Sequence, residues 1–273
     1  MLRSLLVLLL LSCAPVLAFP VPALAGVRRT AAYHALSNAV KGDNVSCVLA
    51  GPEFLQSVQE DLLRTAEVKG LRAVYNLMES PVLVSHWYDL RLHNFLEKHP
   101  HIEQVVLLQP GMSSRAHRVR ALLHKQVYEV DAAPVLFYKR YVLNSSHLSL
   151  LTTLTYCAMQ DNSMDNWMEC LINTGWTSSK PSVFIAQGCW DALPLPVVES
   201  IVQTIVQETA VGGALLFDTV RQMDERRRMT DWLHHFGIEQ FLLEELQSKS
   251  VHQGILSIHD PDFVNRWLVF CQL

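Results

Sequence analysis

This sequence of 273 residues has no excess of basic residues, no repeats and no long apolar run, features that often point directly to a function. Its net charge of −4 shows no excess of basic residues, which argues against a nucleic-acid partner. It has no internal repeat and no low-complexity linker, so one globular domain behind a short leader accounts for its length. The apolar run Leu5–Leu11 is far shorter than the roughly 20 residues that span a bilayer, and we expect no membrane span.

Cysteine and histidine are present without the spacings that bind metals. Of the six cysteines, Cys13 lies in the expected leader, which leaves an odd number and no CxxC pair. This pattern argues against both a disulfide framework and a zinc site. The histidines also lack metal-ligand spacing, and we expect no metal in the protein.

The N-terminus has the three parts of a secretory signal peptide. Arg3 supplies the basic start, Leu5–Leu11 the apolar core, and the small residues before Phe19 or Gly26 the cleavage site. We therefore expect residues 1–25 to be a leader, cleaved after Ala18 or Ala25, and the protein to enter the secretory pathway. The acid-free stretch 19–42 leaves open a second interpretation, a bipartite leader for a plastid.

A nucleotide-type binding unit is predicted between residues 105 and 131. An apolar run meets a turn at Gly111, and a basic amphipathic segment leads to a second apolar run with alternating acids. Glu129 and Asp131 follow Gly111 by 18 and 20 residues, the distance at which an acid accepts hydrogen bonds from ribose hydroxyls. A single glycine makes this a weak example of a glycine-rich loop.

The remaining pattern predicts an α/β fold with a doubly wound, mostly parallel sheet. Short apolar runs predict buried strands, and amphipathic stretches between them predict covering helices. The expected parallel strands are 104–108, 126–130, 182–186 and 213–217. The expected helices are 52–68, 87–97 and 195–209.

Five blocks of the chain, in order, resemble the leucine carboxyl methyltransferase family, which includes polyketide O-methyltransferases. The first block, 27–40, is similar to the family's N-terminal segment, and QPGMSSRAHRV at 109–119 is similar to its GAGLDTRAYRL. Glu129-Val130-Asp131 is followed by Pro134 and Lys139, as in the family. Asp161 with Trp167, and 181–194, supply the last two blocks. The resemblance implies a seven-stranded sheet over 101–273 and an N-terminal helical cap over 26–100. It also implies that 241–246 and 263–271 form the antiparallel pair that closes such a sheet.

The resemblance also implies S-adenosyl-L-methionine as the cofactor and places its site. Gly111 would let the backbone approach the aminoacyl portion. Arg115 and Arg118 match the motif's two arginines, although either could instead be a solvated residue of a surface helix. Glu129 would bind the ribose. Asp131, expected on the opposite side of the strand, would serve local structure or a second hydroxyl. Lys139 is either a surface lysine or an ion-pair partner of Asp131.

Two later blocks complete the expected site. Asp161, with Asn162 beside it, would accept from the adenine amino group, although Asp161 could instead be a helix N-cap before Trp167. Gln187 would lie beside the methyl group that is transferred. We expect a monomer that methylates a carboxylate or hydroxyl oxygen of a small molecule or a C-terminal carboxyl.

Four departures from the family pattern support a different function. Gln109 replaces a glycine, Ser113 an aspartate and Gln187 a glutamate, and the run 84–89 lacks the family's two arginines. An arginine from that run would hold the cofactor's carboxylate through a bidentate pair, worth about 1.5–3 kcal/mol. The alternative is therefore a degenerate member, a pseudo-methyltransferase with a binding or regulatory role.

Overall fold

A computed structural model describes residues 32, 35, 44–146, 152–160, 164–219, 226–245 and 266–273. The expected leader and the predicted adenine-binding residues Asp161 and Asn162 lie outside these ranges. The chain divides into two compact units. The helical unit comprises Met1–Asp89, Gly111–Val119 and Ala133–Leu151, and the sheet unit comprises Leu90–Pro110, Arg120–Ala132 and Thr152–Leu273. The expected boundary between an N-terminal cap and the core near residue 100 stays a prediction.

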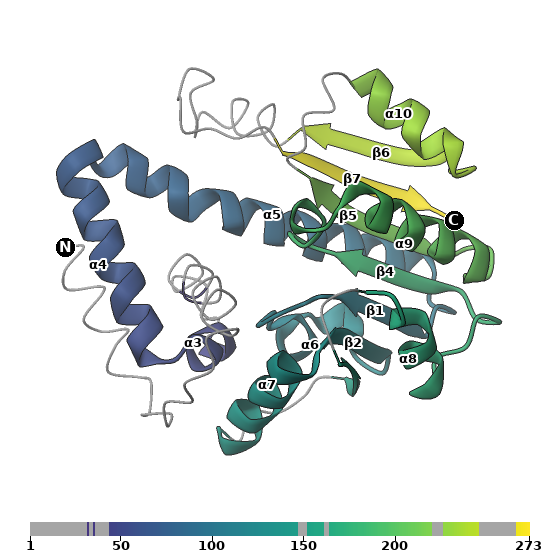
Figure 1. Cartoon of the computed structure of the whole chain (residues 1–273), viewed down its shortest axis with the longest axis horizontal. Helices are drawn as coiled ribbons and strands as arrows, with labels where there is room; N and C mark the ends of the chain where they lie inside the picture. Colours follow the sequence, from purple (N-terminus) through teal and green to yellow (C-terminus); the bar gives the residue numbers. More distant parts are fainter. Residues whose placement is uncertain are drawn as a thin grey trace. The chain divides into compact units, whose positions relative to one another are not determined.

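The sheet unit is built on seven strands in the order β3-β2-β1-β4-β5-β7-β6 (Figure 1). All neighbouring strands are parallel except β7, which runs antiparallel to both β5 and β6. The strands are β1 (Gln104–Leu108), β2 (Gln126–Ala132), β3 (Thr153–Met159), β4 (Ser182–Ala186), β5 (Ala214–Thr219), β6 (Gln240–Glu245) and β7 (Trp267–Gln272). This confirms the predicted doubly wound sheet.

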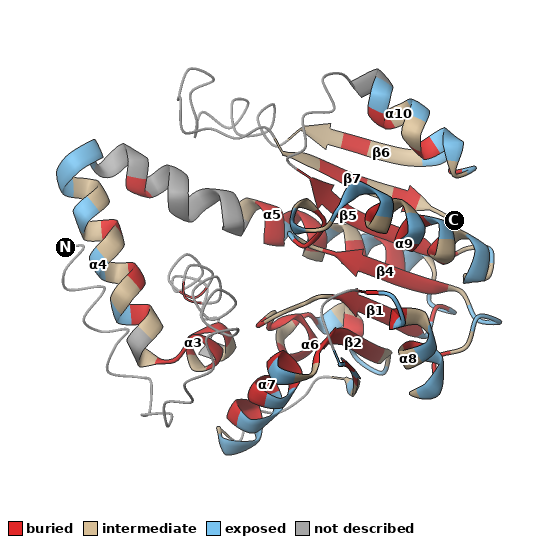
Figure 2. Cartoon of the chain, viewed as in Figure 1, coloured by how far each residue is buried: buried red, intermediate tan, exposed pale blue. Residues whose placement is uncertain are grey.

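The short apolar runs form the buried centre of this sheet. Every residue of β1, β4 and β5 is buried (Figure 2), as expected for parallel strands that are covered on both faces. β1 and β4 have the predicted bounds, and the predicted closing pair forms β6 and β7. β3 was not among the predicted strands, because its residues are only partly buried and its sequence TLTYCAM is not a continuous apolar run.

Helices α8 (Trp167–Asn173), α9 (Leu195–Glu208) and α10 (Arg226–His235) pack on one face of the sheet, here called the α9 face. α9 shows why: Val198, Ile201, Val202 and Ile205 recur at helical spacing and are all buried. The other face is called the α5 face, because Phe95 of α5 contacts Phe270 of β7 with their rings 5.4 Å apart.

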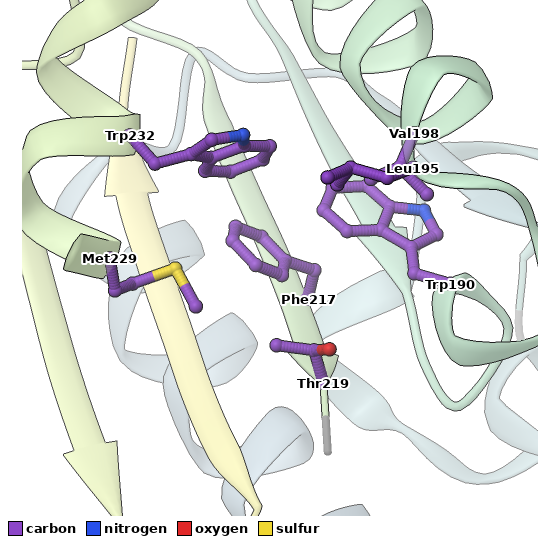
Figure 3. A pocket seen from close by; sticks show the side chains of 7 residues that line it. All are labelled: Trp190, Leu195, Val198, Phe217, Thr219, Met229 and Trp232. Carbon is purple, nitrogen blue, oxygen red and sulfur yellow. The ribbon is translucent and has the colours of Figure 1, made fainter. Parts of the chain in front are cut away.

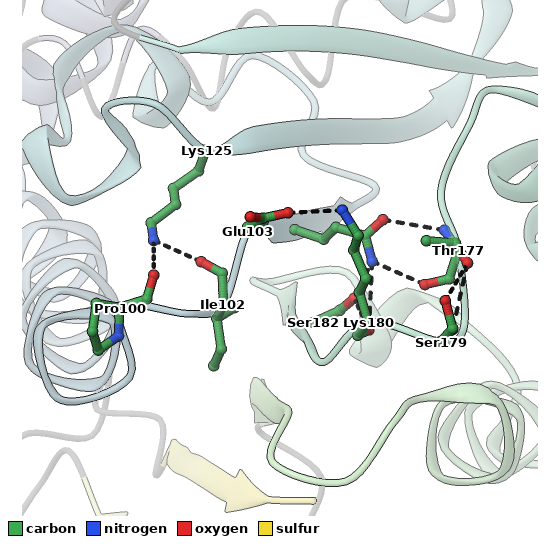
Figure 4. A network of polar contacts seen from close by, with 9 residues as sticks. Pro100, Ile102, Glu103, Lys125, Thr177, Ser179, Lys180 and Ser182 are labelled. Carbon is green, nitrogen blue, oxygen red and sulfur yellow. Dashed lines mark hydrogen bonds and ion pairs between the residues drawn. The ribbon is translucent and has the colours of Figure 1, made fainter.

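Polar side chains fix the loops at the amino edge of the sheet (Figure 4). The Gln104 amide donates to the carbonyl oxygen of Thr177 at 2.9 Å and to the hydroxyl of Ser182 at 3.0 Å. Lys125 donates to the carbonyl oxygens of Pro100 and Ile102. These bonds tie the loops before β1 and β4 to the amino ends of the strands, so this edge has a structural role.

The helical unit contains α3 (Asn44–Ala50), α4 (Pro52–Lys69), α5 up to Asp89, α6 (Arg115–Arg118) and α7 (Ala133–Ser145). α5 as a whole runs over Leu71–Lys98. The predicted helix at 52–68 is confirmed by α4, and the one at 87–97 is the end of α5. None of the described helices has the length and apolar character needed to cross a bilayer.

Candidate functional site at the carboxyl edge of the sheet

The carboxyl ends of β1, β2, β4 and β5 meet at one edge of the sheet unit. In open α/β sheets, ligands bind in the crevice outside these strand ends, where the strand order reverses. Here the strand order reverses between β1 and β4, which lie next to each other at the centre of the sheet. We therefore expect a ligand-binding site at this edge.

The two acids of β2 differ in their position along the strand. Glu129 pairs with Leu107 of β1, lies in one row with Ile185 and Leu216, and is fully buried. Asp131 lies beyond Val130, the last β2 residue that pairs with β1, and is 6% exposed. One of its carboxylate oxygens accepts a 2.8 Å hydrogen bond from the backbone N–H of Ala132. Asp131 is thus at the strand end, whereas Glu129 lies within the sheet.

Both side chains point to the α5 face. The pairing of β2 with β3 is continuous from Gln126 to Ala132, and residues two apart on an uninterrupted strand face the same way. The expectation that Asp131 points away from Glu129 was therefore wrong. The geometry favours Asp131 over Glu129 as the acid that a ligand can reach, and the role of each acid stays a prediction.

The turn that follows β4 is fixed by an acid on the neighbouring strand. Gly188 adopts φ 69°, a conformation that favours glycine, and its N–H donates to Asp218 Oδ1 at 2.8 Å. Asp218 is fully buried at the end of β5, and Arg266 forms an ion pair with its other oxygen. The predicted site residue Gln187, half-buried, lies directly before this turn.

Cys189 directly follows the Gly188 turn and is buried. Its thiol is buried beside the carbonyl oxygen of Leu108, at 3.8 Å. Burial, together with the negative charges of Asp218, Asp131 and Asp191, raises the pKa of the Cys189 thiol well above its usual value. The thiol is therefore neutral at ordinary pH and is not a nucleophile.

Within the helical unit, the two motif arginines bind Asp89 of α5. Arg115 donates from Nε to Asp89 Oδ1 at 2.8 Å, and Arg118 donates to Oδ2 and, at 3.1 Å, to the hydroxyl of Ser85. Burial would raise the pKa of Asp89, but the charges of both arginines and their hydrogen bonds outweigh it and hold the pKa below its usual value. The Arg115 guanidinium also lies over the ring of Tyr88, 5.6 Å from its centre.

Other predicted residues of this unit are placed as follows. Gly111 adopts φ 52°, in the left-handed region that a glycine tolerates without strain. Lys139 is fully buried in α7, which excludes the surface alternative. Arg115 itself is only 2% exposed, so it is a buried partner of Asp89, and a contact with the cofactor stays a prediction.

The alternative role for Asp161 is contradicted by the start of α8. That helix begins at Trp167, and its N-cap residue is Asn166, five positions after Asp161. A role for Asp161 in adenine binding lies outside the described residues. Among the described residues, no three His, Cys, Asp or Glu side chains form a group that could hold a metal ion.

Sequence reasoning missed the acid that fixes the Gly188 turn. Asp218 follows a predicted strand, as Asp131 does, and this common position was the available signal. The partner of Asp218, Arg266, is 48 residues further along the chain, and only the antiparallel pairing of β7 with β5 brings it there. Asp89 was likewise noted only as part of a run without arginines, not as the partner of Arg115 and Arg118.

The strand order defines a doubly wound fold of the methyltransferase class. The profile described as leucine carboxyl methyltransferase matches residues 25–206, about two thirds of the sequence. The chain belongs to this family.

The relatives agree with this assignment. A protein of Mycobacteroides abscessus named "Putative S-adenosyl-L-methionine-dependent methyltransferase" is 27% identical over 183 residues, which cover 64% of this chain and 56% of that protein. A protein of the same name from Mycolicibacterium smegmatis is 24% identical, over 65% of this chain and 55% of its own length. The chain thus spans about half the length of the curated relatives it matches.

Solved structures resemble the chain more distantly. The apo form of the S-adenosylmethionine-dependent methyltransferase SibL has a TM-score of 0.44 and 12% identity, over 77% of this chain and 61% of its own. An O-methyltransferase family protein from Burkholderia thailandensis has a TM-score of 0.46 and 13% identity, over 85% of this chain and 72% of its own. Similarities of this size add nothing to the strand order described above.

Proposed function

We propose that the protein binds S-adenosyl-L-methionine at the carboxyl edge of the sheet unit and transfers its methyl group to a carboxylate or hydroxyl oxygen. Membership of the family supports the reaction class, and the names of the mycobacterial relatives support the cofactor. The observation that carries the proposal is the position of Asp131. Its carboxylate lies at the carboxyl end of β2, beside the central strand β1.

The residues at this edge fit such a cofactor. Asp131 has the place and the acceptor oxygens for a ribose diol, since a carboxylate can accept two hydrogen bonds. Gln109 directly follows β1 and adopts φ 45°, which turns the chain at the end of that strand. The Gly188 turn lacks a side chain, and apart from its chain neighbours no heavy atom of the described residues lies within 4 Å of where a Cβ would be.

The chemistry asked of the protein is modest. When bound, the cofactor would supply a methyl group on a positively charged sulfur, and its remainder would leave as a neutral thioether; a carboxylate acceptor has no proton to lose, whereas a hydroxyl acceptor would also have to give up its proton. The protein has to align the two reactants and exclude water, which can lower the barrier by about 7–11 kcal/mol. No dedicated base is required for a carboxylate acceptor, so the absence of an obvious catalytic acid–base pair in the sequence does not argue against the proposal.

One observation favours the alternative, a degenerate member without activity. Gln109 replaces a family glycine at the turn after β1 and adopts φ 45°, which costs a residue with a side chain about 1–2 kcal/mol. Its half-buried side chain stands where the family backbone is bare. A cofactor would have to approach the turn past this side chain.

Calorimetric titration of the purified chain with S-adenosyl-L-methionine separates the two possibilities. We expect binding in the wild type, and an affinity lower by about one to two decades in Asp131→Asn, since a hydrogen bond to a charged group contributes about 1.5–3 kcal/mol. Glu129→Gln tests the other acid. Glu103→Gln, an exposed acid at the opposite edge, is the matched control and should bind as the wild type does.

The outcomes of this titration are distinct. Loss in Asp131→Asn alone assigns the ribose to Asp131, and loss in Glu129→Gln alone restores the initial prediction. A folded wild type that binds nothing at millimolar cofactor would overturn the proposal in favour of the degenerate alternative.

A further inference from the structure

Helix α7 ends with an exposed asparagine. Asn144 lies in the last turn of this helix, and Ser145 and Ser146 follow it. An asparagine followed two residues later by serine, with no proline between them, is a sequon, the acceptor sequence for an N-linked glycan. Sequons are common in protein sequences, so the surroundings of this one in the folded chain decide whether it suits a sugar.

The hydroxyl groups of the Asn144 sequon form only local bonds. The Ser146 hydroxyl donates to the carbonyl oxygen of Val142 at 2.7 Å, and the Ser145 hydroxyl donates to that of Tyr141 at 2.8 Å. Both bonds join residues four apart at the end of a helix, where the backbone frays most readily. The sequon can therefore be released from the helix without disturbing the interior of the unit.

The other sequon of the described residues is placed differently. Asn44-Val45-Ser46 lies at the start of α3, and Ser46 is only 3% exposed. The Ser46 hydroxyl donates to Ser114 Oγ at 3.3 Å, across 68 positions of the chain. The hydroxyl of this sequon thus belongs to the interior of the helical unit. The folded structure favours Asn144 over Asn44 as the residue that carries a sugar.

An exposed aromatic stripe on α7 leads to Asn144. Phe137 is 66% exposed and Tyr141 is 41% exposed, whereas Tyr138 and Val142 are buried on the other side of the helix. Phe137, Tyr141 and Asn144 follow one another at intervals of four and three residues, which places them on one face of α7. We call this group of three residues the α7 stripe. A sugar ring joined to Asn144 can pack its C–H groups on Tyr141 and remove apolar surface from water.

Exposed aromatic rings are exceptional in this protein. In the sheet unit, Trp190 stacks on Phe217 with ring centres 4.3 Å apart, and Trp232 meets Phe217 edge-on at 6.0 Å (Figure 3). These rings cover one another. Among the Phe, Tyr and Trp side chains whose burial the structure describes, only Phe137 and Tyr141 are exposed. The α7 stripe is thus the place where aromatic surface calls for a cover.

We infer that Asn144 carries an N-linked glycan and that the first sugar lies over Tyr141. The donor is an oligosaccharide joined to a membrane lipid through a diphosphate, in the lumen of the secretory pathway. Asn144 Nδ2 forms a bond to the anomeric carbon of the first sugar and loses a proton, while the bond from that carbon to the lipid diphosphate breaks. Both interpretations of the leader begin with a signal peptide, so both bring the chain to this donor. The inference is independent of methyl transfer.

Translation of the full chain with vesicles of endoplasmic reticulum tests the modification. The wild type should show a shift in electrophoretic mobility that an N-glycan-removing amidase reverses. Asn144→Gln and Ser146→Ala should lose this shift, whereas Ser146→Thr and Asn44→Gln should keep it. Asn173→Gln is the matched control and should also keep it. Asn173 is likewise exposed at the end of a helix, α8, but Gly175 stands where a sequon has its hydroxyl residue.

Hydroxyl-radical footprinting of the glycosylated protein, before and after removal of the glycan, tests the position of the sugar. Oxidation of Tyr141 should increase once the glycan is removed. Oxidation of Val211, which is 93% exposed in the sheet unit, should stay the same and serves as the internal control.

The outcomes separate the glycan from the leader. A shift that persists in full in Asn144→Gln, or a chain with a cleaved leader and no shift, would overturn the glycan while the leader stands. An uncleaved chain without a shift would overturn both. A shift that is lost in Asn44→Gln would overturn the preference for Asn144. Equal oxidation of Tyr141 with and without the glycan would overturn the cover over the α7 stripe.

Discussion

Asp89 is the residue whose replacement has the most sharply defined consequence. It accepts hydrogen bonds from two arginines, and Arg115 is only 2% exposed, so its guanidinium depends on this partner. Asp89→Asn keeps one acceptor oxygen and removes the charge, which should lower the free energy of unfolding by about 1.5–3 kcal/mol at neutral pH. Asp89→Ala leaves a buried guanidinium without its carboxylate, and should cost about 3–5 kcal/mol.

The pH dependence provides a second, independent check. Because the folded-state pKa of Asp89 lies below its usual value, its contribution is complete above the unfolded-state pKa of about 3.9 and is lost as the pH falls through the folded-state value. The stability difference between wild type and Asp89→Asn should therefore be constant from pH 7 to about pH 5. It should then shrink at lower pH, as the wild type takes up the proton that the amide mimics.

Urea unfolding followed by tryptophan fluorescence, at a series of pH values, measures both effects. Glu103→Gln is the matched control, because Glu103 also has a lowered pKa but forms an exposed pair with one lysine. Its replacement should have no measurable effect on stability. A difference between wild type and Asp89→Asn that is below about 0.5 kcal/mol at pH 7, or that persists unchanged at acid pH, would refute the two-arginine arrangement.

Three further predictions concern the backbone and the leader. Gly213→Ala should lower the free energy of unfolding by about 1–3 kcal/mol in urea titration, since the new Cβ would lie 2.6 Å from the Ser182 carbonyl oxygen. Gln109→Gly should raise it by up to about 1 kcal/mol, because relief of a left-handed residue outweighs the added chain entropy, and a decrease would contradict the φ of 45°. We propose that the leader is used: mass spectrometry of the chain expressed in a secreting cell should find the mature N-terminus at Phe19 or Gly26, and an intact Met1 would contradict this.

The sheet could be predicted from the sequence because each of its central strands is a short apolar run that is recognisable without knowledge of its neighbours. β1, β4 and β5 read directly as short buried runs, and α9 as a helix with buried residues at a 3.6 period. β3 was not predicted because it is an edge strand, and the composition of its partly buried residues resembles that of a loop. Edge strands are specified by pairing with a neighbour, and that information is not local.

The site was less predictable for a related reason. The spacing from Gly111 to the acids of β2 admits both Glu129 and Asp131, and only the pairing of β2 with β1 distinguishes an acid inside the sheet from one at its end. In the same way, the ion pair of Asp218 with Arg266 depends on how β7 returns to the sheet. The spacing of a motif along one segment predicts neither of these strand pairings.

The changed motif positions bear more on affinity than on fold. At Gln109 the backbone adopts the left-handed conformation that a glycine would adopt, so the turn keeps its shape at an energetic cost. At Gln187 the charge of the family glutamate is absent, and the adjacent acid Asp218 is already occupied by Gly188 and Arg266. Neither change removes the strand ends or Asp131. A protein altered in this way can retain every element of the methyltransferase fold and still bind its cofactor weakly, which is why the dissociation constant for the cofactor, rather than a test of folding, separates an enzyme from a degenerate member.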